Sequence, residues 1–171
     1  MSNLLSAEVL QAMPPGGRLD EYLAHLDHAA WQDVAEELNL LLPECGLLIG
    51  LPGSDHLLHA VASLRGVPSI QAHLHEVTGH WTLPHLTACG LPDGERAVIL
   101  TAELGSGERE LEVLLVAARR GLEVPVVAAA VEHTNAGGRA RIELQGVILH
   151  AAVQVADTPK GPRLERRIPH A

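Results

Sequence analysis

The fold is decided by the stretch Ala97-Val98-Ile99-Leu100-Thr101-Ala102-Glu103-Leu104-Gly105-Ser106-Gly107-Glu108. Its apolar start, residues 97–101, predicts a buried strand, and the Gly-Ser-Gly sequence predicts a turn. The leucines that follow, over residues 108–120, recur at helical spacing, with acids in the first turn and arginines in the last. The stretch therefore predicts a strand, a turn and a helix, with a glycine-bracketed hydroxyl at the helix N-terminus. Such a junction can hold a phosphate, and an ordinary turn capped by Ser106 is the alternative.

The same alternation of short apolar runs, turns and helical periodicity extends to both sides of this stretch. Strands are expected over residues 46–50, 68–75, 124–131 and 147–155, and a helix over residues 55–64. Residues 76–94 show weak periodicity and predict a long loop or a small irregular excursion. Alternating strands and helices predict an α/β fold with a central, mainly parallel sheet flanked by helices.

Three segments differ in composition. Residues 1–44 are rich in acids, with Arg18 as their only Lys or Arg, and predict an N-terminal acidic helical segment of two amphipathic helices. Residues 45–156 form the α/β core. Residues 157–171 are predicted to form a basic, poorly ordered C-terminal tail.

Composition excludes several classes of protein. The chain has 171 residues and a formal net charge of −9, which disfavours general nucleic-acid binding. No apolar run approaches the roughly 18 residues that a membrane span needs. Cys45 and Cys89 form no metal or redox motif, and no leader sequence is evident, so we expect a cytoplasmic protein.

The order and spacing of these motifs resemble those of the type I phosphoribosyltransferases, in particular the adenine and xanthine types. In that family an apolar strand, paired acids and a Thr-Gly-Gly-Thr-like loop bind phosphoribosyl pyrophosphate. The match extends over roughly residues 45–155, including Arg65-Gly66-Val67-Pro68 after the first helix and Gly137-Gly138-Arg139 after the strand at 124–131. The resemblance implies a purine-type transferase with Mg²⁺ on the pyrophosphate and a homodimeric assembly.

The resemblance also assigns roles around the loop. Thr101 and Ala102 stand where the family has the paired acids that hold the ribose hydroxyls, and neither carries a charge. Glu103 is the neighbouring candidate for a catalytic acid, although adjacent strand residues point to opposite faces. Glu108 would place a carboxylate beside a bound phosphate and repel it. The candidate ligand loop consists of Thr101, Ala102, Leu104, Gly105, Ser106 and Gly107.

A second loop resembles the family's pyrophosphate loop. Its candidates are Pro52, Gly53, Ser54 and Asp55, with His73 at the end of the following strand where the family carries a basic residue. Capping of the next helix by Ser54 or Asp55 is the alternative, with Asp55 paired to His59.

Histidines gather at His73, His75, His80 and His85. His73 and His75 would share one face of a strand, a pair suited to zinc or iron, although no carboxylate follows at metal-binding spacing. The alternative is a set of half-buried loop histidines. His80 and Trp81 are candidates for a flap over the ligand, and packing or a dimer contact is the alternative for Trp81.

Together these features predict a phosphoribosyltransferase-fold protein that lacks transferase activity. It would bind a nucleotide or another phosphorylated metabolite, or act as a regulatory or interaction protein. An active purine phosphoribosyltransferase using Glu103 and Mg²⁺ is the alternative, and a partner-binding protein without a small ligand is the third possibility.

Overall fold

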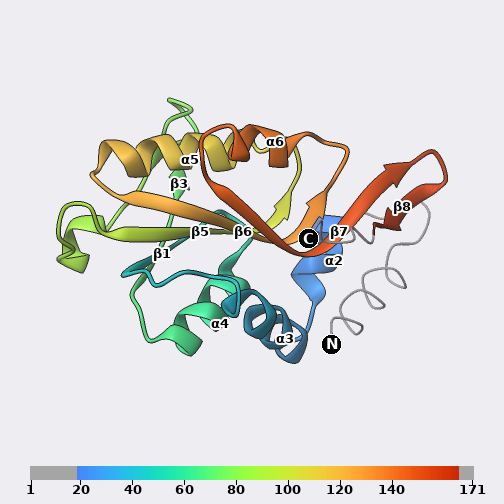
Figure 1. Ribbon diagram of the computed structural model, residues 1–171, viewed down its shortest axis with the longest axis horizontal. Coiled ribbons are helices and arrows are strands. Elements are labelled where there is room, and N and C mark those ends of the chain that lie inside the picture. The colour runs from blue at the N-terminus through green and yellow to red at the C-terminus, as the bar shows by residue number, and fades with distance from the viewer. Residues whose placement is uncertain (1–18, 166–171) are drawn as a thin grey trace.

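The computed structural model describes residues 19–165, and a six-stranded sheet runs through its centre (Figure 1). The strand order is β2-β1-β5-β6-β7-β8, in which every pair is parallel except β7 with β8. The strands are β1 (Leu47–Gly50), β2 (Ser69–Gln71), β5 (Arg96–Leu104), β6 (Glu123–His133), β7 (Ile148–Thr158) and β8 (Gly161–Leu164). The predicted α/β fold with a mainly parallel sheet is confirmed.

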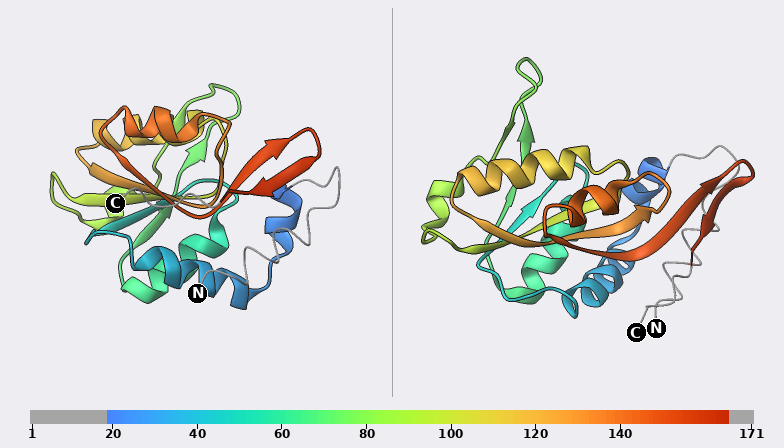
Figure 2. Two further views of the ribbon diagram at one scale, coloured as in Figure 1. Left: turned by 45° about the vertical axis from the view of Figure 1, so that its right-hand side comes forward. Right: turned by 45° about the horizontal axis from the view of Figure 1, so that its top comes forward.

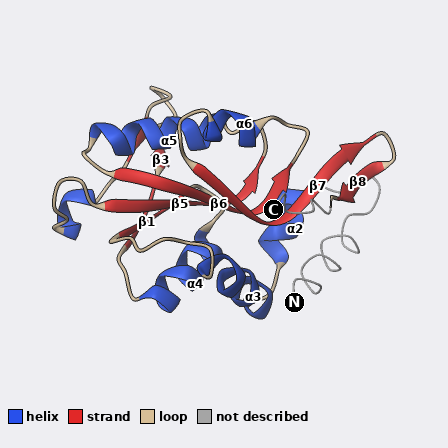
Figure 3. Cartoon of the chain, in the orientation of Figure 1, coloured by secondary structure: helices blue, strands red, loops and turns tan. Residues whose placement is uncertain are grey.

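Helices cover both faces of this sheet (Figure 3). One layer contains α2 (Leu19–His25), α3 (His28–Asn39) and α4 (Asp55–Arg65), and the other contains α5 (Glu108–Arg119) and α6 (Gly138–Glu143). None of the helices between residues 19 and 165 is long and apolar enough to cross a membrane.

The central strands are apolar on both sides because each side packs under a helical layer. On β5, Leu100 belongs to the cluster beneath α2, α3 and α4, whereas its neighbour Ile99 belongs to the cluster beneath α5 and α6. Both side chains are completely buried. The alternation along a strand therefore divides one short apolar run between two cores.

The acidic N-terminal segment differs from the prediction in its helices. The stretch expected to form one helix after residue 18 is divided at Asp27, whose carboxylate accepts a hydrogen bond from the Ala30 N–H and so begins α3. Trp31, Val34 and Leu38 of α3 are buried against the sheet. The helix expected before residue 18 lies outside the described residues.

Two predictions for residues 68–94 are corrected. The single strand expected over residues 68–75 divides into β2 of the main sheet and β3 (His73–Leu74), which pairs antiparallel with β4 (Trp81–Thr82). Ala72 is buried at the point where the chain leaves the main sheet. Residues 76–94 therefore contain half of a protruding hairpin (Figure 2) and a 3-10 turn, Leu86–Cys89.

The C-terminal part is more regular than predicted. The chain forms the short helix α6 after the turn at residues 135–138, a helix that the sequence pattern did not predict. The tail, expected to be poorly ordered, turns back as β8 and forms a hairpin with β7 that projects from the body (Figure 2). Residues 166–171 lie outside the described residues.

Glycines allow the turns after β5 and β6 to touch. A Cβ atom on Gly138 would lie 2.3 Å from the carbonyl oxygen of Gly105, and one on Gly107 would lie 2.9 Å from the Cα of Gly138. Gly107 also has a φ of +77°, which other residues rarely adopt. The backbone contact therefore fixes the position of the loop at residues 105–107.

We expect Gly138→Ala to lower the free energy of unfolding by about 1–3 kcal/mol, the usual cost of overpacking, because backbone surrounds the added methyl group. Gly105→Ala is the matched control, since a methyl group added there would meet no atom within 4 Å and the φ of Gly105 is ordinary. Urea denaturation measures both. Equal stability of the two variants would contradict this contact.

Candidate functional site

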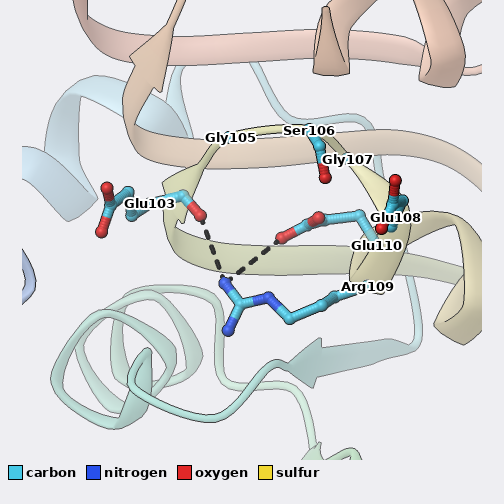
Figure 4. A pocket seen from close by; sticks show the side chains of 7 residues that line it. All are labelled: Glu103, Gly105, Ser106, Gly107, Glu108, Arg109 and Glu110. Atoms are coloured by element: carbon cyan, nitrogen blue, oxygen red, sulfur yellow. Dashed lines mark hydrogen bonds and ion pairs between the residues drawn. The ribbon is translucent and has the colours of Figure 1, made fainter. Parts of the chain in front are cut away.

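A hollow of about 250 Å³ lies at the carboxyl end of β5, where it meets α5 (Figure 4). Ligands of parallel α/β sheets bind at this end of the strands. In Figure 4 the side chains of Ser106, Arg109 and Glu110 point into one space, whereas the Glu103 carboxylate points away from it. The hollow is lined by Glu103, Gly105, Ser106, Gly107, Glu108, Arg109 and Glu110.

The inner wall of the hollow is a buried carboxylate. Glu110 is only 2% exposed, and the Thr101 hydroxyl donates a hydrogen bond of 3.0 Å to its Oε1. Thr101 is itself buried, and its hydroxyl also lies 3.2 Å from the carbonyl oxygen of Glu103. Thr101, which the sequence resemblance assigns to the first acid position, is thus bound to the interior of the protein. Ala102, assigned to the second, is buried in the core beneath α2, α3 and α4.

Burial raises the pKa of Glu110 above its ordinary value, because the charged form loses hydration. The backbone N–H of the same residue, the nearby Arg109 and the Thr101 hydroxyl act in the opposite direction, and burial outweighs them. Glu110 therefore takes up a proton more readily than an exposed glutamate.

Arg109 is the basic residue among those that line the hollow. The Arg109 Nη2 lies 3.5 Å from the Glu103 carbonyl oxygen and 3.9 Å from Glu110 Oε1. The Arg109 side chain is half exposed, so its guanidinium has N–H groups left for a ligand. The Glu108 carboxylate, expected to repel a phosphate, pairs at 2.7 Å with Arg141 of α6, and this pairing reduces the repulsion.

The Glu103 carboxylate is engaged elsewhere. Its Oε1 lies 2.7 Å from His133 Nε2 at the end of β6, and His133 Nδ1 lies 2.9 Å from Asp157 Oδ2 on β7. Glu103 lies beside the ligand loop, as its sequence position requires, while its acid group is turned toward the neighbouring strands. Leu104 is fully buried in the core beneath α5 and α6, next to the loop at residues 105–107.

The second predicted loop, residues 51–55, follows β1 at the same edge of the sheet. Pro52 and Gly53 are exposed, whereas Ser54 is buried and donates its hydroxyl to the Leu51 carbonyl at 2.7 Å. Ser54 therefore does not cap α4 with its side chain. Asp55 was predicted to pair with His59. It instead accepts a 2.6 Å hydrogen bond from Gln71 of β2.

His73, His75 and His80 lie on the β3–β4 hairpin and His85 follows it, and none of them lines the hollow at residues 103–110. His73, His75 and His85 line a separate hollow of about 340 Å³ together with Leu74, Thr82 and Pro84. Within residues 19–165, no three or more His, Cys, Asp or Glu side chains are arranged to hold a metal ion. His80 is exposed, and Trp81 is buried in the core beneath α5, as expected for the packing alternative.

Sequence reasoning missed Glu110, His133 and Asp157. Glu110 had a local signal, because a glutamate at the third helical residue is typical of the first turn of a helix. His133 and Asp157 had none, since they lie 30 and 24 residues from the partners they meet. The parallel arrangement of β5, β6 and β7 brings His133 and Asp157 together with Glu103.

Comparison with known proteins supports the fold. No protein-family model matches the chain, and neither does any curated protein. Two similar structures are adenine phosphoribosyltransferases. The APRTase from Giardia lamblia complexed with 9-deazaadenine has a TM-score of 0.68 at 13% identity, over 87% of this chain and 97% of that one. The enzyme from Rhodothermus marinus has a TM-score of 0.66 at 18% identity, over 88% and 98%.

A third similar structure is the Leishmania donovani UMP synthase, with a TM-score of 0.59 at 22% identity. The match covers 74% of this chain and 27% of the UMP synthase. At such identities these likenesses establish the fold alone. The chain has a type I phosphoribosyltransferase-like fold, and the expectation drawn from the sequence resemblance is confirmed in this respect.

We expect Glu110→Gln to stabilise the protein near neutral pH and to flatten the pH dependence of its stability. An acid whose pKa is higher in the folded state loses stability as the pH rises from its unfolded pKa of about 4.3 through the folded value. The amide keeps the shape of the side chain and removes the charge. Thermal unfolding at several pH values between about 4 and 8 measures the effect.

Glu112→Gln is the matched control, because Glu112 is an exposed residue of the same helix. An equal response of the two variants to pH would show that burial does not govern Glu110.

Proposed function

We propose that this chain binds a phosphorylated small molecule, such as a nucleotide, at the loop of residues 104–109 and does not transfer a phosphoribosyl group. The observation that carries this proposal is the hydrogen bond between Thr101 and Glu110. It turns Thr101, which the resemblance assigns to the first ribose-binding position, toward the interior, while the loop beyond it borders a hollow of about 250 Å³.

Several features of the hollow favour binding of an anion. The N-terminal N–H groups of the 12-residue helix α5 carry a partial positive charge, and Ser106 adds a hydroxyl donor. Arg109 supplies a guanidinium with free donors. Two of the acids that line the hollow have arginine partners: Glu108 pairs with Arg141, and Glu110 lies 3.9 Å from Arg109, which reduces their repulsion of an anion.

Other features disfavour transfer. Stabilising an electron-poor ribosyl centre requires acids placed on the ribose hydroxyls, and catalysis of this kind depends on positioning and electrostatics. Ala102 cannot supply an acid, and Glu103 is bound to His133. Thr101, Ala102 and Glu103 therefore present no free carboxylate to a ribose.

The test is an assay of pyrophosphate release from phosphoribosyl pyrophosphate and Mg²⁺ with adenine, hypoxanthine, guanine and xanthine, alongside calorimetric titration with AMP, GMP and inorganic phosphate. We expect no release, and binding of the monophosphates. Release that Glu103→Gln abolishes would contradict the proposal and favour the active purine phosphoribosyltransferase. Absence of release together with absence of binding would favour a partner-binding protein.

A pair of variants tests the location of the ligand. We expect Arg109→Gln to weaken AMP binding by roughly tenfold, the usual loss for one hydrogen bond to a charged group. Arg119→Gln, at the exposed opposite end of α5, should leave it unchanged. Equal affinities of the two variants would place the ligand elsewhere.

A further inference from the structure

The imidazole of His133 lies between two carboxylates from different strands. Its Nε2 is 2.7 Å from Glu103 Oε1 at the end of β5, and its Nδ1 is 2.9 Å from Asp157 Oδ2 near the end of β7. His133 is the last residue of β6, which separates these two strands. One ring therefore joins the ends of three adjacent parallel strands.

Counting donors fixes the protonation state that this geometry requires. An ionised carboxylate only accepts hydrogen bonds, and a neutral imidazole has a single N–H. If His133 were neutral, the lone pair of one ring nitrogen would face a carboxylate oxygen less than 3 Å away, since the two contacts are 2.7 Å and 2.9 Å long. Both contacts are favourable together only when both ring nitrogens carry a proton.

The surroundings of His133 favour this charged form. The hydrogen bond to Glu103 raises the pKa of His133 and outweighs the lowering by burial, and Asp157 raises it further. Glu103 from β5 and Asp157 from β7 are the charged groups that face the ring. Asn135, from the following turn, is neutral, and the adjacent Glu132 is bound to Arg139 of α6.

Asp157 lies near the turn of the projecting β7–β8 hairpin, one residue before the last pair, Thr158 with Gly161. Its register partner is Pro162 of β8, and its backbone is held by Asn135 through two hydrogen bonds, of 2.8 Å and 3.1 Å. The Asp157 side chain binds His133, and His133 binds Glu103 of β5. His133 therefore connects Asp157 to β5.

We infer that His133 is a proton-dependent clamp: the imidazolium ties the end of β5 to Asp157 near the turn of the β7–β8 hairpin, and loss of its proton releases Asp157. Asp157 is the partner that separates because its side chain is 56% exposed and can be hydrated, whereas Glu103 is 31% exposed. The Asn135 hydrogen bonds remain, so the hairpin loosens without detaching. This inference is independent of ligand binding at the loop of residues 104–109.

The sign of the pH effect follows from the raised pKa. The clamp is fully formed below the unfolded histidine pKa of about 6.5, and its contribution disappears as the pH rises through the higher folded value. The hairpin should therefore be more mobile above the folded pKa of His133 than below it.

Nitrogen NMR of the histidine rings in the full chain tests the clamp directly. We expect both ring nitrogens of His133 to be protonated at about pH 6.5, with a midpoint above that pH. His150 is an internal reference, because burial and Arg139 lower its pKa. Hydrogen exchange of the amides in residues 158–164, corrected for intrinsic rates, should become about tenfold faster across the His133 midpoint, as for loss of one charged hydrogen bond.

Asp157→Asn should lower the His133 midpoint and remove the pH dependence of hairpin exchange. Asp55→Asn is the matched control, since Asp55 is a hydrogen-bonded aspartate that contacts Gln71 and no imidazole, and it should change neither measurement. A single protonated ring nitrogen on His133 at about pH 6.5, or hairpin exchange that does not respond to pH, would overturn the clamp. Both readouts on the unmodified protein are independent of whether a variant folds.

Discussion

The hydrogen bond from the Thr101 hydroxyl to the buried Glu110 carboxylate joins the end of β5 to the first turn of α5. A carboxylate that is 2% exposed is costly unless polar groups surround it, and Thr101 and the backbone of the first helical turn supply them. The bond occupies the end of the strand at which ligands of such sheets bind. The contact holds the end of β5 against the first turn of α5 on either side of the loop at residues 105–107, and Glu110 lines the hollow.

The remaining contacts at this edge of the sheet hold the neighbouring loops around that centre. Gly107 and Gly138 let the turns after β5 and β6 touch through their backbones, and Arg141 reaches from α6 to Glu108. Glu103 belongs to two sets of contacts, since its carbonyl oxygen lies near Arg109 and its carboxylate binds His133. The ligand loop and the β7–β8 hairpin are therefore connected through one residue.

Local patterns were sufficient to predict the fold. The apolar run at residues 97–101, the Gly-Ser-Gly turn and the helical periodicity after Glu108 identify a strand, a turn and a helix, and their repetition identifies a parallel sheet. Where contacts across the fold decide, the patterns failed. Nothing within residues 161–164 indicates pairing with β7. The periodicity of the acidic segment did not show that Asp27 begins a new helix.

The candidate site was predictable in position and only partly in chemistry. The residues of the loop at 104–109 adjoin one another in the sequence, so the hollow could be located. The partners of its charged groups could not be found, because Glu108 pairs with a residue 33 positions away and Glu103 with one 30 positions away. The pairing with Arg141 reduces the repulsion expected of Glu108, and the contact with His133 turns Glu103 away from the catalytic role expected of it.

The central claim is that the loop holds a phosphate while nothing holds the ribose as a transferase would. A crystal structure of the complex with AMP tests it most directly. The account predicts a phosphate on the N–H groups of residues 106–109 and on Arg109, with Thr101 still bound to Glu110 and Glu103 to His133. A structure in which Glu103 leaves His133 and binds the ribose hydroxyls would contradict it.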